Sequence, residues 1–137
     1  MLNDKLGLSV LLYLLSADAA KADRAEEVLA GGGTVSVQVL NEFAAVASRK
    51  LRMPWADIRE VLAQVRAVCT VAPINLETHD AALRLAERYG LSIDDALIVA
   101  ASLQAGCKTL HSEDMQHGQV IDRKLSIRNP FRQMISK

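Results

Sequence analysis

The chain alternates between short apolar runs and longer stretches in which apolar residues recur at helical spacing. The short runs predict strands at Val10–Leu15, Thr34–Val37, Cys69–Ile74, Cys107–His111 and Leu125–Arg128. The helical spacing, bounded by capping residues and glycines, predicts helices over 19–30, 38–50, 55–68, about 76–89 and 92–105. Strands that alternate with helices predict an α/β fold with a mainly parallel sheet.

Composition narrows this picture without giving a function. The chain has 137 residues, which fits one domain over residues 1–137, and half of its residues are hydrophobic whereas 4% are aromatic. The formal net charge is zero, so no overall basic field indicates nucleic-acid binding. Cys69 and Cys107 lie far apart without metal-ligand spacing, which favours a reduced, cytoplasmic protein. The apolar run from Leu6 to Leu15 is too short to span a bilayer, so no membrane association is expected.

Three carboxylates lie where one predicted element gives way to the next. Glu42 follows the second strand, Asp95 opens a helix, and Asp114 follows the fourth strand. Because functional groups of parallel sheets gather at the carboxyl ends of the strands, these acids can face one site. Clustered carboxylates need a cation, and Mg²⁺ or Mn²⁺ suits all-oxygen ligands. Each acid also has a simpler interpretation: Asp95 favours a helix dipole, Glu42 is a solvated helix residue, and Asp114 caps a turn.

Four segments carry a resemblance to a known family. The chain resembles the PIN-domain ribonucleases, and most closely the VapC-type toxins of bacterial toxin–antitoxin pairs. The segment Ser92–Ala101, with Asp95-Ala96-Leu97-Ile98 at its centre, is similar to the family's Asp-containing helix. The other similar segments are Thr109–Met115, which ends the fourth strand, Val37–Phe43, which carries Glu42, and Asn129-Pro130-Phe131.

The resemblance implies a PIN-like three-layer fold, in which helices flank a mainly parallel sheet of four to five strands. It implies a Mg²⁺- or Mn²⁺-dependent endoribonuclease that cleaves RNA, with Glu42, Asp95 and Asp114 as catalytic residues and metal ligands. It also implies an antitoxin partner and a homodimer.

One acid of the family's cluster of four is missing. Gly7 stands where the first strand of the family ends in Asp, and Asp4, three residues earlier, is a poor substitute because it lies about 10 Å away on an extended strand. Ser9 can keep part of the hydrogen bonding of the family's Asn. Asp94 either restores some charge or is a solvated residue of the first helical turn. We therefore expect weakened or absent cleavage, regained in Gly7→Asp. The alternatives are a catalytically dead module that binds antitoxin or RNA, and an unrelated doubly wound domain.

A few further residues are candidates for accessory roles. Ser112 could orient a carboxylate or cap a turn, and His117 could reach a substrate phosphate or lie in a surface loop. Arg123, Lys124 and Arg128 belong to a basic C-terminal segment that could hold an RNA backbone or be a solvated tail. The spacing of the three histidines and two cysteines matches no zinc pattern.

Overall fold

The computed structural model describes residues 4–131, and its centre is one six-stranded sheet with the order β3-β2-β1-β4-β6-β5. Neighbouring strands are parallel except β5, which is antiparallel to β6. All parallel strands therefore end at the same side of the sheet, which we call its carboxyl end. The strands are β1 (Asp4–Leu6), β2 (Thr34–Ser36), β3 (Thr70–Ala72), β4 (Thr109–His111), β5 (Val120–Ile121) and β6 (Leu125–Arg128).

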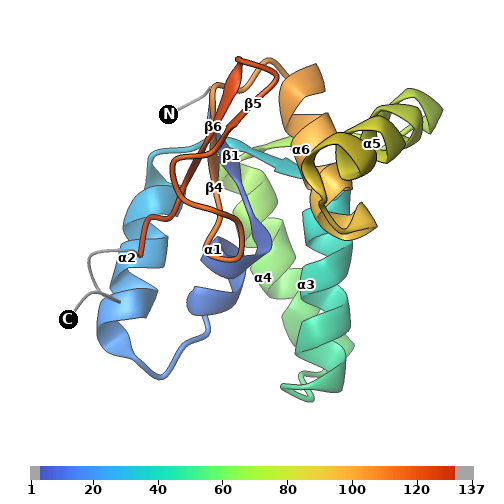
Figure 1. Ribbon diagram of the computed structural model, residues 1–137. Helices are drawn as coiled ribbons and strands as arrows, with labels where there is room; N and C mark the ends of the chain where they lie inside the picture. The colour runs from blue at the N-terminus through green and yellow to red at the C-terminus, as the bar shows by residue number, and fades with distance from the viewer. Residues whose placement is uncertain (1–3, 132–137) are drawn as a thin grey trace.

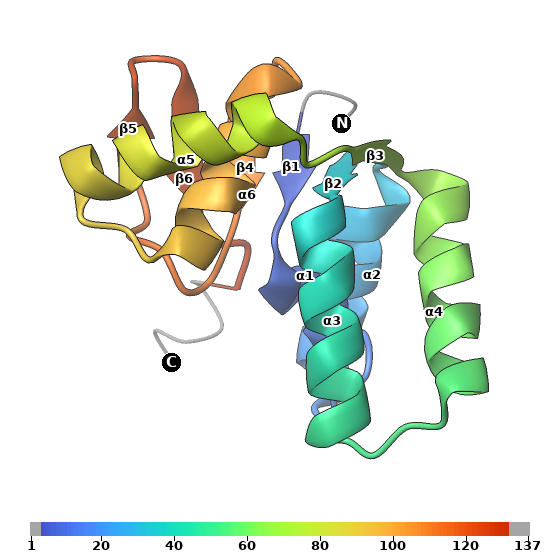
Figure 2. The same cartoon turned by 90° about the vertical axis from the view of Figure 1, so that its right-hand side faces the viewer.

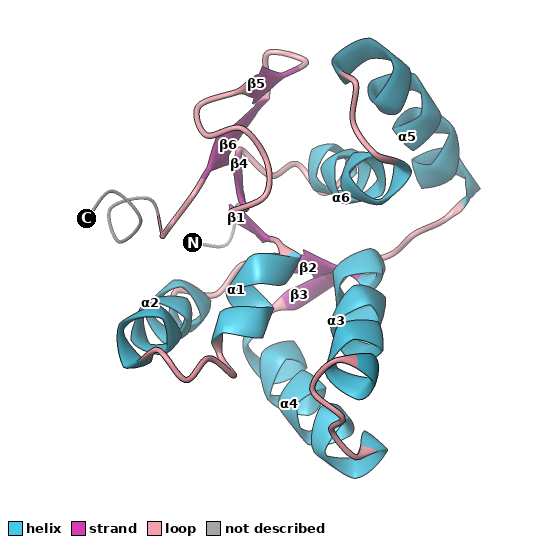
Figure 3. Cartoon of the chain, turned by 60° about the horizontal axis from the view of Figure 1, so that its bottom comes forward, coloured by secondary structure: helices cyan, strands magenta, loops and turns pink. Residues whose placement is uncertain are grey.

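Helices cover both faces of this sheet, as the α/β pattern predicts (Figure 1). Helices α1 and α2 lie on one side of the sheet, and α5 and α6 lie on the other (Figure 3). Helices α3 and α4 run side by side at the β2–β3 end of the sheet (Figure 2). The helices are α1 (Leu8–Tyr13), α2 (Ala19–Ala30), α3 (Val37–Arg49), α4 (Trp55–Val68), α5 (Leu76–Tyr89) and α6 (Ile93–Gln104).

The first strand was wrongly predicted. The apolar run at Val10–Leu15 is not a strand: most of it belongs to α1, and β1 is the preceding segment, Asp4–Leu6. Val10 and Leu11 are fully buried, and Leu8, Leu12 and Tyr13 also pack against the core. A short helix surrounded by apolar partners is apolar all round, so it has no period that distinguishes it from a buried strand.

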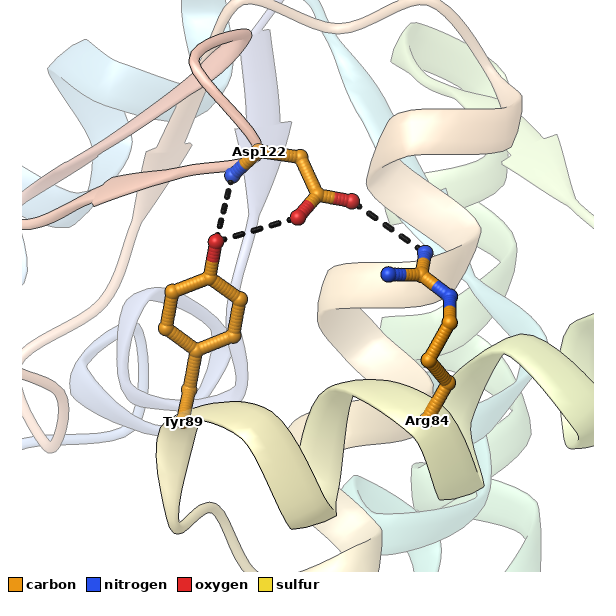
Figure 4. Close-up of polar contacts among 3 residues, drawn as sticks. All are labelled: Arg84, Tyr89 and Asp122. Atoms are coloured by element: carbon orange, nitrogen blue, oxygen red, sulfur yellow. Dashed lines mark hydrogen bonds and ion pairs between the residues drawn. The ribbon is translucent and has the colours of Figure 1, made fainter.

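No strand was predicted in the segment 115–122. It contains β5, so the described part of the sheet has six strands rather than four or five. Figure 4 shows how the β5–β6 turn is attached to α5. The Asp122 carboxylate accepts from the Tyr89 hydroxyl at 3.0 Å and pairs with Arg84 at 3.1 Å, while the Asp122 N–H donates to the Tyr89 oxygen at 2.9 Å.

The helix pair α5–α6 holds the strongest local signals in the chain. Asn75 and Thr78 form a capping box at the start of α5, and Gly90 ends that helix in the left-handed conformation. The Ser92 hydroxyl then accepts from the Asp95 N–H at 3.1 Å and caps α6. Because both helix starts are fixed, the position of Asp95 relative to the sheet is fixed with them. Within residues 4–131, none of the helices is long and apolar enough to cross a membrane.

Candidate metal centre

Glu42, Asp95 and Asp114 come from three different elements near the carboxyl end of the sheet. Glu42 lies in α3, which begins directly after β2. Asp95 lies in the first turn of α6, and Asp114 follows β4 after three residues. Helix α6 ends just before β4 begins, at the opposite end of the sheet. The N-terminus of α6 therefore lies at the carboxyl end, beside the ends of the parallel strands. Asp114 is exposed and the other two acids are partly buried.

The charges of these acids act on one another. Burial, together with the charges of Asp94, Asp95 and Asp114, raises the pKa of Glu42, and a hydrogen bond from Gln38 only partly opposes this. Burial, followed by the charges of Asp114 and Asp94, likewise raises the pKa of Asp95 against the hydrogen bond from Ser92. The local field is therefore negative and under-compensated, which favours a bound cation.

Gln38 is a residue of this site that the sequence did not reveal. Its amide nitrogen donates to Glu42 Oε1 at 3.1 Å and lies 3.3 Å from Asp94 Oδ1. The amide thus links α3 to the first turn of α6 and brings Asp94, an exposed residue, to the border of the acidic cluster. The i, i+4 spacing of Gln38 and Glu42 was visible in the sequence, but the approach of α6 was not.

The backbone at Gly7 is tightly packed. Gly7 directly follows β1, and its N–H donates to the His111 carbonyl at 2.9 Å. A Cβ atom on Gly7 would lie only 2.7 Å from that carbonyl oxygen. Asp at this position therefore requires a backbone shift between β1 and β4, so Gly7→Asp changes packing as well as charge. Asp4 pairs with Thr109, at the far end of β4 from Asp114.

The donor set fits a hard divalent cation only in part. Across residues 4–131, no three His, Cys, Asp or Glu side chains converge closely enough to hold a metal ion. Carboxylate oxygens are nevertheless the ligands that Mg²⁺ prefers, and Mg²⁺ commonly uses one or two carboxylates while keeping several waters. The arrangement thus fits an ion held mainly through Asp95 and Asp114, with water and substrate oxygens completing its coordination.

The serine and histidine candidates have structural contacts. Ser9 Oγ accepts from the Glu113 N–H at 3.1 Å. The buried Ser112 donates its N–H to the Arg128 carbonyl at 2.8 Å. His117 Nδ1 accepts from the Asn129 N–H at 3.0 Å, so this nitrogen holds the segment after β6. These contacts fix the loop that carries Asp114.

The three basic candidates do not form one surface. Arg128 ends β6 and pairs in register with His111, so it lies at the carboxyl end of the sheet with the acids. Arg123 and Lys124 lie in the turn before β6, at the opposite end. A pocket of about 590 Å³ also lies at that opposite end, lined by Thr34, Thr70 and Ala105 among others.

Comparison with known proteins identifies related structures. A family model of the PIN domain matches residues 9–121. No curated protein matches the sequence. A crystal structure of the toxin VapC20 of Mycobacterium tuberculosis, described as cleaving the sarcin-ricin loop, has a TM-score of 0.66 at 19% identity, covering 81% of this chain and 89% of that chain.

Two complexes are also similar in fold. A toxin–antitoxin complex from Klebsiella pneumoniae gives a TM-score of 0.70 at 15% identity, with 93% of this chain and 97% of that chain covered. VapBC2 of Rickettsia felis, bound to a DNA fragment from its promoter, gives a TM-score of 0.62 at 18% identity, with 92% of this chain and 97% of that chain covered.

Proposed function

The chain belongs to the PIN-domain family, and we propose that it is a Mg²⁺- or Mn²⁺-dependent endoribonuclease of the toxin type, weakened by Gly7. The observation that carries this proposal is the mutual repulsion of acids from α3, α6 and the loop after β4. Burial and neighbouring carboxylates raise the pKa of both Glu42 and Asp95. A fold gains nothing from uncompensated clustered charge, so such a cluster favours a functional site.

In the proposed reaction each acidic residue has a separate part. Asp95 and Asp114 would hold the divalent ion, and Glu42 would complete its environment from the α3 side. When bound, this ion would neutralise charge on the phosphodiester and promote deprotonation of the attacking water. Gln38 orients the Glu42 carboxylate through their 3.1 Å hydrogen bond. Arg128, exposed at the same end of the sheet, is available to contact the RNA backbone.

Gly7 explains why the activity should be low. No side chain at the end of β1 can hold or orient the ion or the water. Loss of one such group costs on the order of 3 kcal/mol in barrier, or about two orders of magnitude in rate.

An antitoxin is the proposed partner. Its support is the fold, which is shared with the toxin–antitoxin complex of Klebsiella pneumoniae and with VapBC2 of Rickettsia felis. The homodimer and the cytoplasmic location stay predictions from the family resemblance and the composition.

A catalytically dead module that binds antitoxin or RNA is the second candidate function. Two observations favour it: Gly7 has no side chain that could bind an ion, and within residues 4–131 no three potential ligands converge. In this case the protein keeps its fold and its binding to antitoxin or RNA, but it does not cleave RNA with a metal ion.

One cleavage assay separates the two candidates. Structured RNAs are incubated with the protein in Mg²⁺, in Mn²⁺ and in chelator, and Asp95→Asn is the matched inactive variant. Weak metal-dependent cleavage that Asp95→Asn abolishes supports the enzyme. Absence of cleavage at high protein concentration supports the binding module.

The role of Gly7 needs a steric control, because any Cβ there meets the His111 carbonyl. Gly7→Ala adds the Cβ without the carboxylate, and Gly7→Asp adds both. Faster cleavage in Gly7→Asp than in Gly7→Ala would show that the carboxylate is what the site lacks. Equal rates in these two variants would reject the assignment of Gly7 as the missing ligand position.

A further inference from the structure

Helix α1 makes two hydrogen bonds to Glu113, in the loop that carries Asp114. The Tyr13 hydroxyl donates to Glu113 Oε1 at 2.6 Å, and the Glu113 N–H donates to Ser9 Oγ at 3.1 Å. Ser9 and Tyr13 are both in α1. The residue immediately before a proposed metal ligand is thus held at its backbone and at its side chain by one helix.

Tyr13 is itself held in place on two sides. Its ring packs edge-on against the buried Phe131, with ring centroids 4.5 Å apart and an interplanar angle of 69°. Lys21 of α2 donates to the Tyr13 oxygen at 3.4 Å, and its ammonium lies 4.8 Å from the ring centroid. Because the lysine donates to the oxygen, the tyrosine proton is left to point at Glu113.

The Glu113 carboxylate contacts the Tyr13 hydroxyl and affects its pKa. Burial and then the hydrogen bond to Glu113 raise the pKa of Tyr13, so the Glu113 carboxylate acts on Tyr13. The carboxylates that raise the pKa of Asp95 are instead Asp114 and Asp94. The hydrogen bonds of Glu113 are thus made with α1, through Ser9 and Tyr13, while the charge of Asp114 acts on Asp95 in α6.

We propose that Tyr13 is a positioning residue for Asp114: its hydrogen bond holds Glu113 against α1 and so fixes the loop that carries Asp114. The proposal rests on the proposed function for its consequence, which is metal binding, but the attachment of the loop can be tested without metal. It assigns a role to α1: this helix supplies no ligand but holds the loop that carries one.

Tyr13→Phe is the decisive variant, because phenylalanine keeps the ring packing against Phe131 and removes only the hydroxyl. The matched control is Tyr89→Phe, which removes the tyrosine hydroxyl that donates to Asp122 at 3.0 Å. Asp122 is not one of the three proposed site acids. Amide hydrogen exchange at Glu113 and Asp114 is measured in metal-free protein, and Mn²⁺ affinity is measured by titration.

We expect Tyr13→Phe to speed amide exchange at Glu113 and Asp114 and to weaken Mn²⁺ binding about tenfold, as loss of a group that orients a ligand does. Tyr89→Phe should change exchange around Asp122 and leave Mn²⁺ affinity as in the wild type. In a Glu113→Ala background, Tyr13→Phe should have no further effect on either measurement.

Exchange and Mn²⁺ affinity that stay at wild-type values in Tyr13→Phe would overturn the proposal. An undiminished effect in the Glu113→Ala background would also overturn it, because Tyr13 would then act by another route. If the wild-type protein binds no Mn²⁺, the proposed metal-dependent function fails instead. The exchange rates at Glu113 and Asp114 still decide whether Tyr13 positions the loop.

Discussion

Lys5 places an ammonium group in the middle of the sheet, on β1, where its side chain is fully buried. Its Nζ makes no hydrogen bond within residues 4–131. Burial lowers the pKa of Lys5 to about 8, and the nearby Cys107 only partly opposes this shift. An apolar residue of similar length would avoid the cost of desolvating a charge.

Lys5→Met should therefore stabilise the protein at neutral pH, by up to about 3 kcal/mol given the size of the pKa shift. In the wild type the folded state releases the Lys5 proton near pH 8 and the unfolded state near 10.5. Between these values the unfolded state binds more protons, so wild-type stability rises with pH. Denaturant unfolding of both proteins at about pH 7 and about pH 9.5 should show the advantage of Lys5→Met shrinking at the higher pH. A constant difference would contradict the burial of a charged lysine.

Asp95→Asn should raise the stability of the metal-free protein by roughly 0.5–1 kcal/mol, after allowance for solvent screening of a half-exposed group. The pKa of Asp95 is raised because burial and the charges of Asp114 and Asp94 outweigh the hydrogen bond from Ser92. A raised folded-state pKa also means that the wild type loses stability as pH rises from the unfolded value near 3.8 through the folded one. Thermal unfolding at mildly acidic and neutral pH measures both effects. Lower stability of Asp95→Asn at neutral pH would show that the helix dipole dominates.

At the scale of single residues, the sequence offered three candidate acids, whose role as ligands stays a prediction, but it did not show what surrounds them. Glu42, Asp95 and Asp114 were visible because each follows or opens a patterned element. Gln38 and Lys5 were missed, because an amide in a helix and a lysine near a terminus look like ordinary solvated residues. Their roles depend on contacts and burial that only the packed fold supplies.

At the scale of elements, periodicity was reliable wherever a helix has one solvated face. Helices α2 to α6 were predicted within a few residues, since each has polar positions that reveal its period. Helix α1 was missed because it is apolar on almost every side. The two-residue strand β5 was missed because its pairing with β6, rather than its own pattern, defines it.

The α5 capping box gives a prediction for an element. The Thr78 N–H donates to Asn75 Oδ1 at 3.0 Å and the Asn75 N–H donates to Thr78 Oγ1 at 3.2 Å. Asn75→Ala removes the first of these bonds and should cost about 1 kcal/mol in the free energy of unfolding. Chemical denaturation measures this cost. Mn²⁺ affinity should not change, because Asn75 caps the start of α5 whereas Asp95 lies in the first turn of α6, beyond the other end of α5. A matching loss of Mn²⁺ affinity would show that α5 also controls the site.

At the scale of the whole molecule, alternation of strands and helices was enough to predict a mainly parallel sheet and hence a shared carboxyl end for the acids. The strand order was not predictable, because it depends on how the helices pack on both faces. The order places β1 between β2 and β4, so Gly7 lies beside the end of β4. Because of this neighbour, a side chain cannot be added at Gly7 without moving the backbone.

The molecule is a PIN-domain protein with a proposed metal site that has three acids and no fourth acid at Gly7. Its metal affinity should be low and should fall as pH decreases, since protons compete for Glu42 and Asp95, whose pKa values are raised. In a Mn²⁺ titration followed by electron paramagnetic resonance, the bound fraction at fixed Mn²⁺ should decline from neutral to mildly acidic pH. A flat profile would indicate ligands other than these carboxylates.

The most direct test is that Mn²⁺ titration at neutral pH on the wild type, Asp95→Asn and Asp114→Asn, with Asp122→Asn as a control acid outside the site. The account predicts one weak site in the wild type, with a dissociation constant on the order of 0.1–1 mM. Each site variant should weaken binding by about tenfold or more, and Asp122→Asn should bind as the wild type does. Equal affinity in the wild type and in both site variants, or no binding to any of them, would contradict a metal centre built from Asp95 and Asp114.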